Sequence, residues 1–266
     1  MIFASDLDRT LIYSKKFISN REGIKLIEKK DDEEISFMTE KAIKELKKLR
    51  EELLFIPVTT RTIEQYERIT LFQEEVPKYA VVSNGGNILI DGKIDVEWNN
   101  SIQRKIKEEC LPFEEVLLKF KEIASKEWVI KRRTADQLFT YCIVDRKKMP
   151  IEKIYSFMDW LEKRNWKVSL QGRKLYFVPH CVCKWRALQY IKEQENIDFI
   201  ISAGDSLLDL PMLKRADISF APAHGEIYKS YRADGEAKNI IFTEREGILA
   251  AEEILEKINS YAKKAG

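Results

Sequence analysis

Three short polar clusters, each directly after an apolar run, carry the side chains best suited to chemistry. The opening stretch MIFASDLDRTL places Asp6 and Asp8 two residues apart at the end of the first run. The run LLFIPV is followed by TTRT, which contains Thr59, Thr60 and Arg61. Because like charges at the spacing of the two aspartates repel, we expect something at that edge to gain from both carboxylates.

The third cluster is GDSLLD, which follows the run FIISA and supplies Asp205 and Asp209. In an open parallel sheet, ligands bind outside the carboxyl ends of the strands. If these runs are neighbouring parallel strands, all three clusters therefore face one crevice. Lys184, at the start of an expected helix, is the cation that would balance their charge.

This set of groups favours phosphoryl transfer. Crowded carboxylates are unfavourable unless a divalent cation compensates them. An all-oxygen ligand set suits Mg²⁺, which often shares its coordination shell with a phosphate. Hydroxyl groups, backbone N–H groups and a lysine are suitable partners for that phosphate. The clusters thus indicate transfer of a phosphoryl group to a carboxylate nucleophile.

The elements that must position these residues alternate between strand and helix. Buried strands are predicted over 1–5, 53–58 and 79–83, where the runs are almost continuously apolar. Residues 24–39 predict a hairpin, and TIEQYERITLF predicts one helix. Thr39 is the expected N-cap of a helix through about residue 52.

The section 99–178 has a different pattern, in which helices and strands follow an α+β order. After residue 184 the alternation resumes. We therefore predict an α/β fold: a doubly wound, Rossmann-like parallel sheet made of residues 1–98 and 179–266, with a smaller α+β cap domain inserted as 99–178.

The order D-x-D-x-T, a hydroxyl residue, a lysine and G-D-x-x-x-D resembles the haloacid dehalogenase superfamily of phosphatases. The likeness spans residues 1 to about 220, and the inserted section is similar to the α/β cap that some members carry. VPHCVCKWRAL around Lys184 resembles the group that includes the sucrose-phosphate and mannosyl-3-phosphoglycerate phosphatases and the Cof-type hydrolases.

The resemblance implies a role for each matching position. Asp6 would be the nucleophile, and Asp8 would protonate the leaving alcohol and then deprotonate the attacking water. Thr59 and Thr60, with the backbone amide beside them, and Lys184 would hold the phosphate. The Mg²⁺ ligands would be the carboxylate of Asp6, the backbone carbonyl of Asp8 and the carboxylates of Asp205 and Asp209.

Substrate selection is expected to involve further cations, and the resemblance implies a cap that closes over the site. We predict substrate contacts from four basic side chains: Arg61, Arg132, Arg173 and Lys174. Arg9 stands where many relatives have glycine, which changes the lining near the phosphate.

Composition excludes several other classes. The formal net charge of +2 argues against nucleic acid as the main partner. No apolar run reaches the length of a membrane span, and the N-terminus does not have the pattern of a signal peptide. The four cysteines are scattered, so we expect a cytoplasmic protein with reduced thiols. A zinc site at Cys181 and Cys183 would need a second ligand pair.

The function expected is therefore hydrolysis of a small phosphorylated metabolite, such as a sugar phosphate, by a Mg²⁺-dependent phosphatase acting through an aspartyl-phosphate. Two alternatives remain open. A phosphosugar mutase would use the same aspartates and return the phosphoryl group to the sugar. A binding protein would hold a phosphorylated ligand or a protein partner without turnover. The sequence does not specify the metabolite or the oligomeric state.

Overall fold

The computed structural model describes residues 1–18, 22–231 and 239–265. They form two compact units, one inserted into the other along the chain. The core unit contains both ends of the chain, and the inserted unit comprises Asp95–Cys183. Each unit encloses its own cluster of buried apolar side chains.

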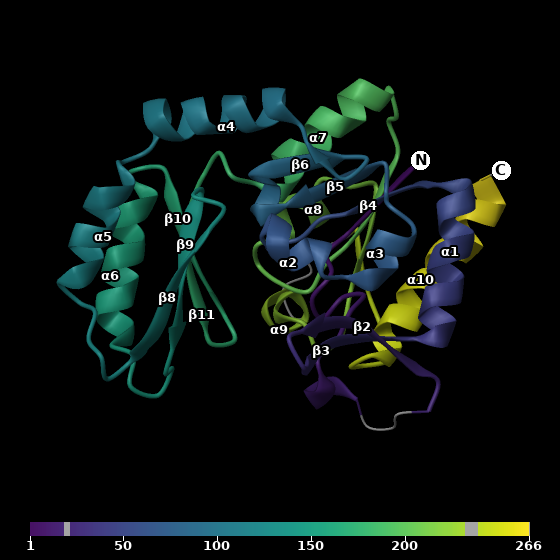
Figure 1. Cartoon of the computed structure of the whole chain (residues 1–266), viewed down its shortest axis with the longest axis horizontal. Helices are drawn as coiled ribbons and strands as arrows, with labels where there is room; N and C mark the ends of the chain where they lie inside the picture. The colour runs from purple at the N-terminus through teal and green to yellow at the C-terminus, as the bar shows by residue number, and fades with distance from the viewer. Residues whose placement is uncertain (19–21, 232–238, 266) are drawn as a thin grey trace. The chain divides into compact units, whose positions relative to one another are not determined.

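A five-stranded parallel sheet lies at the centre of the core unit (Figure 1). In spatial order its strands are β14 (Ile240–Phe242), β13 (Ile218–Ala221), β12 (Ile200–Ala203), β1 (Ile2–Ser5) and β4 (Leu54–Pro57). β1 is buried along its whole length, as expected of a strand covered on both faces. The sheet confirms the predicted α/β fold with a Rossmann-like parallel core.

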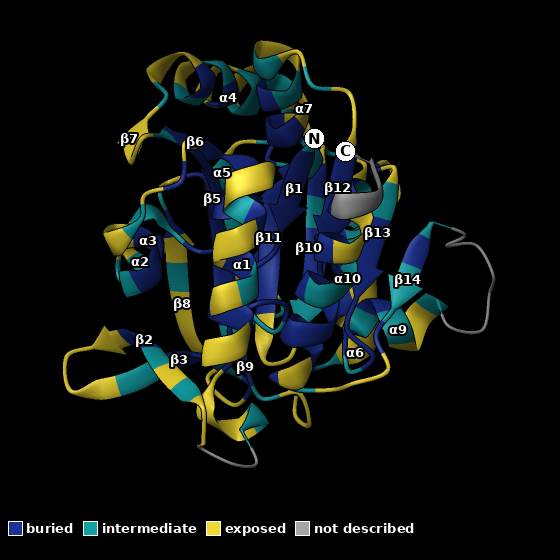
Figure 2. Ribbon diagram, turned by 90° about the vertical axis from the view of Figure 1, so that its right-hand side faces the viewer, coloured by how far each residue is buried: buried dark blue, intermediate teal, exposed yellow. Residues whose placement is uncertain are grey.

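Helices cover this sheet. Figure 1 shows α1 and α10 side by side along the sheet, and both contribute apolar side chains such as Leu46 and Ile254 to the core cluster. Figure 2 shows the central strands buried and the outer face of α1 exposed. The helices of the core unit outside the TTRT region are α1 (Glu40–Glu52), α7 (Lys184–Glu195), α8 (Leu210–Leu213), α9 (Glu226–Tyr231) and α10 (Leu249–Ala265).

Smaller antiparallel elements flank the sheet. The predicted hairpin consists of β2 (Ile24–Lys30) and β3 (Glu33–Thr39). The predicted strand YAVVS forms part of a second small sheet, made of β5 (Tyr79–Val82), β6 (Asn87–Ile90) and β7 (Lys93–Ile94). Asp91 and Gly92 between β6 and β7 have positive φ angles of 48° and 77°, which is the conformation that a D-G hairpin turn requires. Short 3-10 turns occur at Lys15–Phe17 and Ser83–Gly85.

The prediction of one helix over TIEQYERITLF was wrong. Two short helices, α2 (Ile63–Glu67) and α3 (Thr70–Glu74), are separated by Arg68 and Ile69. Ile69 is fully buried, has an extended backbone and forms an isolated antiparallel bridge with the hairpin. Pairing with the hairpin therefore replaces the helical turn at this point.

The inserted unit is an α+β unit with an antiparallel sheet in the order β10-β11-β9-β8. Helices α5 and α6 bury Phe120 and Phe157 together with Phe177 of the sheet. The strands are β8 (Val129–Ala135), β9 (Phe139–Val144), β10 (Trp166–Gln171) and β11 (Lys174–Pro179). The helices are α4 (Val96–Glu109), α5 (Phe113–Lys121) and α6 (Ile151–Glu162).

The inserted unit, Asp95–Cys183, is slightly longer than the cap domain predicted over 99–178. It begins earlier because the whole of α4, which starts at Val96, belongs to it. Among the described residues, no helix combines the length and the hydrophobicity needed to cross a bilayer.

Candidate active site

The parallel sheet brings two of the three polar clusters together at the ends of β1 and β12. Asp6 directly follows β1, and its backbone N–H donates to the carbonyl of Ala203 at the end of β12, at 2.8 Å. On the other side of β1, the backbone N–H of Val58 donates to the carbonyl of Ser5 at 2.7 Å, so the cluster after β4 lies beside them. The sheet register thus places Thr59 next to the strand end that carries Asp6.

Lys184, the first residue of α7, is fully buried between two carboxylates. Its ammonium Nζ lies 2.6 Å from Oδ1 of Asp6 and 2.5 Å from Oδ1 of Asp209. Burial alone would lower the pKa of Lys184, but the charges of Asp209 and Asp6 raise it above its usual value. Lys184 therefore stays protonated and ties together three segments that are far apart in the sequence.

Asp6, Asp205 and Asp209 form a buried acidic cluster in which each can offer one oxygen within 4.8 Å of the others. Burial and then the charge of Asp209 raise the pKa of Asp6 to about 7, although Lys184 opposes this shift. Burial and the charge of Asp6 likewise raise the pKa of Asp205 well above its usual range. Burial is the largest cause of both shifts and the charge of a neighbouring aspartate is the second, so these carboxylates lie close together and away from water.

The donor set of this cluster fits a divalent cation that prefers oxygen. Oδ2 of Asp205 is buried and accepts no hydrogen bond, although Nη1 of Arg9 lies 3.3 Å away as an ion-pair partner. A buried carboxylate oxygen without a donor is costly unless a cation contacts it. Oxygen ligands of this kind are those that Mg²⁺ takes in proteins.

The turn after β12 explains how Asp209 reaches the cluster. The backbone N–H and the hydroxyl of Ser206 donate to Oδ2 of Asp209 at 2.9 and 2.7 Å. A Cβ atom on Gly204 would lie 2.5 Å from Cβ of Asp209. The glycine of GDSLLD is therefore required for the close approach of the aspartate to the strand end.

Arg9 lies in the turn after Asp8 with a left-handed φ of 68°. This conformation favours glycine, which agrees with the glycine expected at this position in related sequences. The guanidinium of Arg9 contacts Asp205, and its Nη2 also donates to the carbonyl of His224 at 3.1 Å. The ring Nε2 of His224 in turn lies 3.0 Å from the carbonyl oxygen of Arg9.

The carboxylate of Asp8 lies outside the acidic cluster. Nε and Nη2 of Arg61 donate to its two oxygens at 2.8 and 2.9 Å. The Asp8 side chain is 49% exposed, whereas that of Arg61 is buried. The hydroxyl of Thr10 donates to Oδ2 of Asp6 at 3.2 Å. The two aspartates of the first motif thus have separate partners.

The predicted phosphate-binding residues Thr59 and Thr60 lie at the end of β4. Thr59 is fully buried, and its Oγ1 accepts the backbone N–H of Arg61 at 3.1 Å. Thr60 is partly exposed. Their role in holding a phosphate stays a prediction.

Three predicted substrate residues belong to the inserted unit. Arg132 is exposed on β8, and Arg173 is exposed in the turn before β11. The ammonium of Lys174 lies 5.6 Å from the centre of the Tyr141 ring. Their contact with a substrate stays a prediction.

Sequence reasoning missed Glu28 and Ser36 of the β2–β3 hairpin, whose side chains contact the guanidinium of Arg61. The sequence signal is weak because Glu28 stands in the charged run EKKDDEE, where acidic residues are expected to be solvated. Glu28 could have been identified only from the pairing register of β2 with β3, because that register decides which acidic side chain of the hairpin points toward Arg61.

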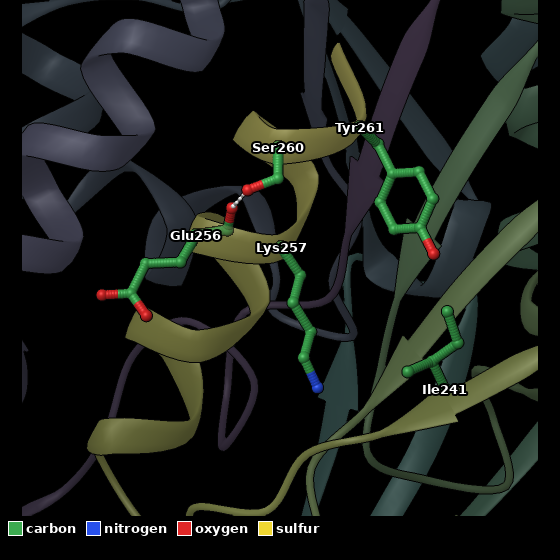
Figure 3. Close-up of a pocket in the computed structure, with 5 residues that line it drawn as sticks. All are labelled: Ile241, Glu256, Lys257, Ser260 and Tyr261. Carbon is green, nitrogen blue, oxygen red and sulfur yellow. Dashed lines mark hydrogen bonds between the residues drawn. The ribbon is translucent and has the colours of Figure 1, made fainter. Parts of the chain in front are cut away.

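A separate pocket of about 340 Å³ is lined by residues of α10 and by Ile241 of β14, and by none of the predicted site residues. Figure 3 shows Tyr261 and Ile241 on one side and Lys257 opposite them, whereas the carboxylate of Glu256 points away from these residues and Ser260 donates to the carbonyl of Glu256. Nothing in its lining resembles the acidic cluster.

Comparison with known proteins gives one family. A family model described as sucrose-6F-phosphate phosphohydrolase matches residues 1–262. No curated protein matches this chain by sequence.

Among solved structures, the sucrose-phosphatase of Synechocystis sp. PCC6803, in complex with sucrose and phosphate, has a TM-score of 0.72 and 16% identity over 98% of this chain and 97% of that chain. A sugar phosphatase of subclass IIB of the haloacid dehalogenase superfamily has a TM-score of 0.64 and 13% identity over 98% of each chain. At these identities the likeness shows a shared fold.

Proposed function

Because the chain belongs to the sucrose-6F-phosphate phosphohydrolase family, we propose that it hydrolyses a sugar phosphate in a Mg²⁺-dependent reaction through an aspartyl-phosphate at Asp6. Membership of this family makes the chain a phosphatase of the haloacid dehalogenase superfamily, which is a hydrolase of phosphoric monoesters. The family description and the sucrose and phosphate bound by the Synechocystis protein support a phosphorylated sugar as the substrate.

In the first step, a carboxylate oxygen of Asp6 attacks the phosphorus atom. The bond between that oxygen and phosphorus forms while the bond between phosphorus and the sugar oxygen breaks, and Asp8 donates a proton to the leaving oxygen. Contacts of Asp6 with Lys184 and Thr10 support this role because they fix the orientation of its carboxylate.

In the second step, a water molecule attacks the phosphorus atom of the aspartyl-phosphate. The carboxylate of Asp8 accepts a proton from the water, the bond from Asp6 to phosphorus breaks, and inorganic phosphate leaves. The paired contact of Arg61 with both oxygens of Asp8 suits the ionised form that accepts this proton.

The residues that would hold Mg²⁺ are Asp6, Asp205 and Asp209, together with the backbone carbonyl of Asp8. When bound, the ion would offset the charge of the buried carboxylates and of the phosphate. Lys184 adds a fixed positive charge beside the nucleophile. This buried bridge from Lys184 to Asp6 and Asp209 is the observation that carries the proposal, because such a cation is needed where a carboxylate must attack an anion.

The test is a set of phosphorylated sugars, including sucrose 6-phosphate and hexose phosphates, assayed for phosphate release with and without Mg²⁺. Asp6→Asn is the blank. Release that requires both Mg²⁺ and Asp6 supports the proposal. An isomerised sugar phosphate in place of free phosphate would indicate a mutase, and tight binding without turnover would indicate a binding protein.

A further inference from the structure

The guanidinium of Arg61 has an acceptor for each of its five N–H groups. Nε and Nη2 donate to Asp8, as described above. Nη1 donates to Oε2 of Glu28 at 2.8 Å and to the carbonyl of Gln65 at 3.2 Å, and Nη2 also donates to the hydroxyl of Ser36 at 3.1 Å. Arg61 therefore has no donor left for a substrate, and its role must be found in what it holds.

Glu28 is the partner that fixes the other edge of this guanidinium. Its side chain is buried, and its Oε2 also accepts the hydroxyl of Ser36 at 2.6 Å. Nε of Arg68 donates to Oε1 at 3.3 Å. A buried carboxylate is costly without such partners, so the burial of Glu28 is tied to the position of Arg61.

An irregularity in the hairpin places Glu28 there. The pairing of β2 with β3 shifts register on both sides of Glu28, and Ile27 and Glu28 are buried in succession. In a regular strand, consecutive side chains point to opposite faces. A register irregularity can re-aim a side chain, and here a charged side chain is buried beside Arg61.

We propose that Glu28 is a positioning residue for Asp8 and acts through Arg61. The Asp8 side chain is half exposed and follows the strand end, so without a fixed partner it would sample several rotamers. Two hydrogen bonds from one planar guanidinium define its orientation, and Glu28 with Ser36 defines that of the guanidinium. This inference rests on the proposed function, in which Asp8 transfers protons.

The consequence is specific to the leaving group. As the bond from phosphorus to the leaving oxygen breaks, the proton of the Asp8 carboxyl group moves to that oxygen. A phenol leaving group needs this proton more than p-nitrophenol does, because p-nitrophenol is the stronger acid and leaves readily as its anion. A misplaced Asp8 therefore slows phosphoryl transfer from phenyl phosphate more than from p-nitrophenyl phosphate.

The experiment compares kcat/KM of Glu28→Gln with that of the wild-type protein on these two probes in the presence of Mg²⁺. We expect a loss of about tenfold to a hundredfold on phenyl phosphate and of less than about threefold on p-nitrophenyl phosphate. Ser36→Ala, which removes one hydroxyl from the same network, should give a smaller change of the same kind. Glu33→Gln, the same change at an exposed position of the hairpin, is the matched control and should alter neither value.

The ratio of the two values within one variant does not depend on how much of the protein is folded. Equal losses on both probes, or no loss on either, would overturn the positioning role and leave the proposed function intact. A wild-type protein that releases no phosphate from either probe and from none of the sugar phosphates would instead overturn the proposed function, and with it this inference.

Discussion

Asp6 and Asp8 differ in their surroundings more than in their sequence context. Asp6 is buried with Lys184 and two further aspartates, whereas Asp8 is half exposed and bound by Arg61. A nucleophile needs a fixed position beside positive charge, and a proton-transfer group needs access to the leaving oxygen and to water. The two environments match these two requirements.

Asp8→Asn tests the proton-transfer role. The amide oxygen can keep one of the two hydrogen bonds from Arg61 while the amide NH₂ cannot accept the other, and the side chain can neither donate an acidic proton nor accept one from water. We expect kcat to fall by about 10²–10⁴-fold for a sugar phosphate with little change in the unfolding temperature. A steady-state assay with a thermal melt checks this, and near wild-type turnover would remove Asp8 from the mechanism.

The sequence was sufficient to find the aspartates of the acidic cluster. Asp6 and Asp205 each follow an apolar run that ends a parallel strand, so their meeting depends only on strand order. Glu28 could not be found in this way, because its burial depends on a register irregularity and on a partner, Arg61, more than thirty positions away. The local pattern of a charged hairpin contains neither piece of information.

At the scale of elements, the turns after the strands do the positioning. The turn from β12 to α8 carries Asp205 and Asp209 on either side of Ser206, and Gly204 lets the chain pass close to Asp209. The two short helices after β4 are separated by Ile69, which contacts the hairpin that also supplies Glu28. The contact between Ile69 and the hairpin explains why TIEQYERITLF forms two short helices and not the single helix that its periodicity predicted.

Gly204→Ala tests the turn. The new methyl group would overlap Cβ of Asp209, so the carboxylate must move and its contact with Lys184 must lengthen. We expect a loss of about tenfold or more in kcat/KM and a higher Mg²⁺ concentration for half-maximal activity. Gly23→Asn, at a position with open space and a φ of 65°, is the control. Unchanged Mg²⁺ dependence in Gly204→Ala would contradict this account of the turn.

At the scale of the whole molecule, the chain forms two units with separate cores. The inserted unit is continuous in sequence and buries its own aromatic cluster, including Phe120, Phe157 and Trp166. We therefore predict that residues 95–183 fold when expressed alone. Circular dichroism should show a cooperative thermal transition, and a chain with no transition and no protected amides would contradict the prediction.

Binding of Mg²⁺ should stabilise the protein in a pH-dependent way. Burial and Asp209 raise the pKa of Asp6 from 3.8 to about 7, so between these values the folded protein holds more protons than the unfolded chain. Without the ion, the contribution of Asp6 to the free energy of unfolding therefore falls as pH rises through this range. Mg²⁺ must displace the proton from Asp6 in order to bind. The increase in unfolding temperature caused by Mg²⁺ should therefore grow between about pH 5.5 and about pH 8, which bracket the pKa of Asp6 at about 7.

Thermal melts at fixed Mg²⁺ across this pH range check that prediction, with Asp6→Asn as the reference. In the variant the rise with pH should be weaker, because one of the two titrating ligands is gone and the pKa of the other, Asp205, is no longer raised by the charge of Asp6. A Mg²⁺-induced shift that is the same at both ends of the range, or the same in the variant, would contradict the assignment of Asp6 as a ligand.

The central claim is that a phosphoryl group becomes attached to Asp6 during turnover. It is tested most directly by quenching the protein in acid during turnover of a substrate, reducing any acyl phosphate with borohydride and sequencing the peptides by mass spectrometry. We predict homoserine in place of aspartate at position 6, and none in samples without substrate. Full turnover with an unmodified Asp6, or with the modification at another residue, would contradict the account.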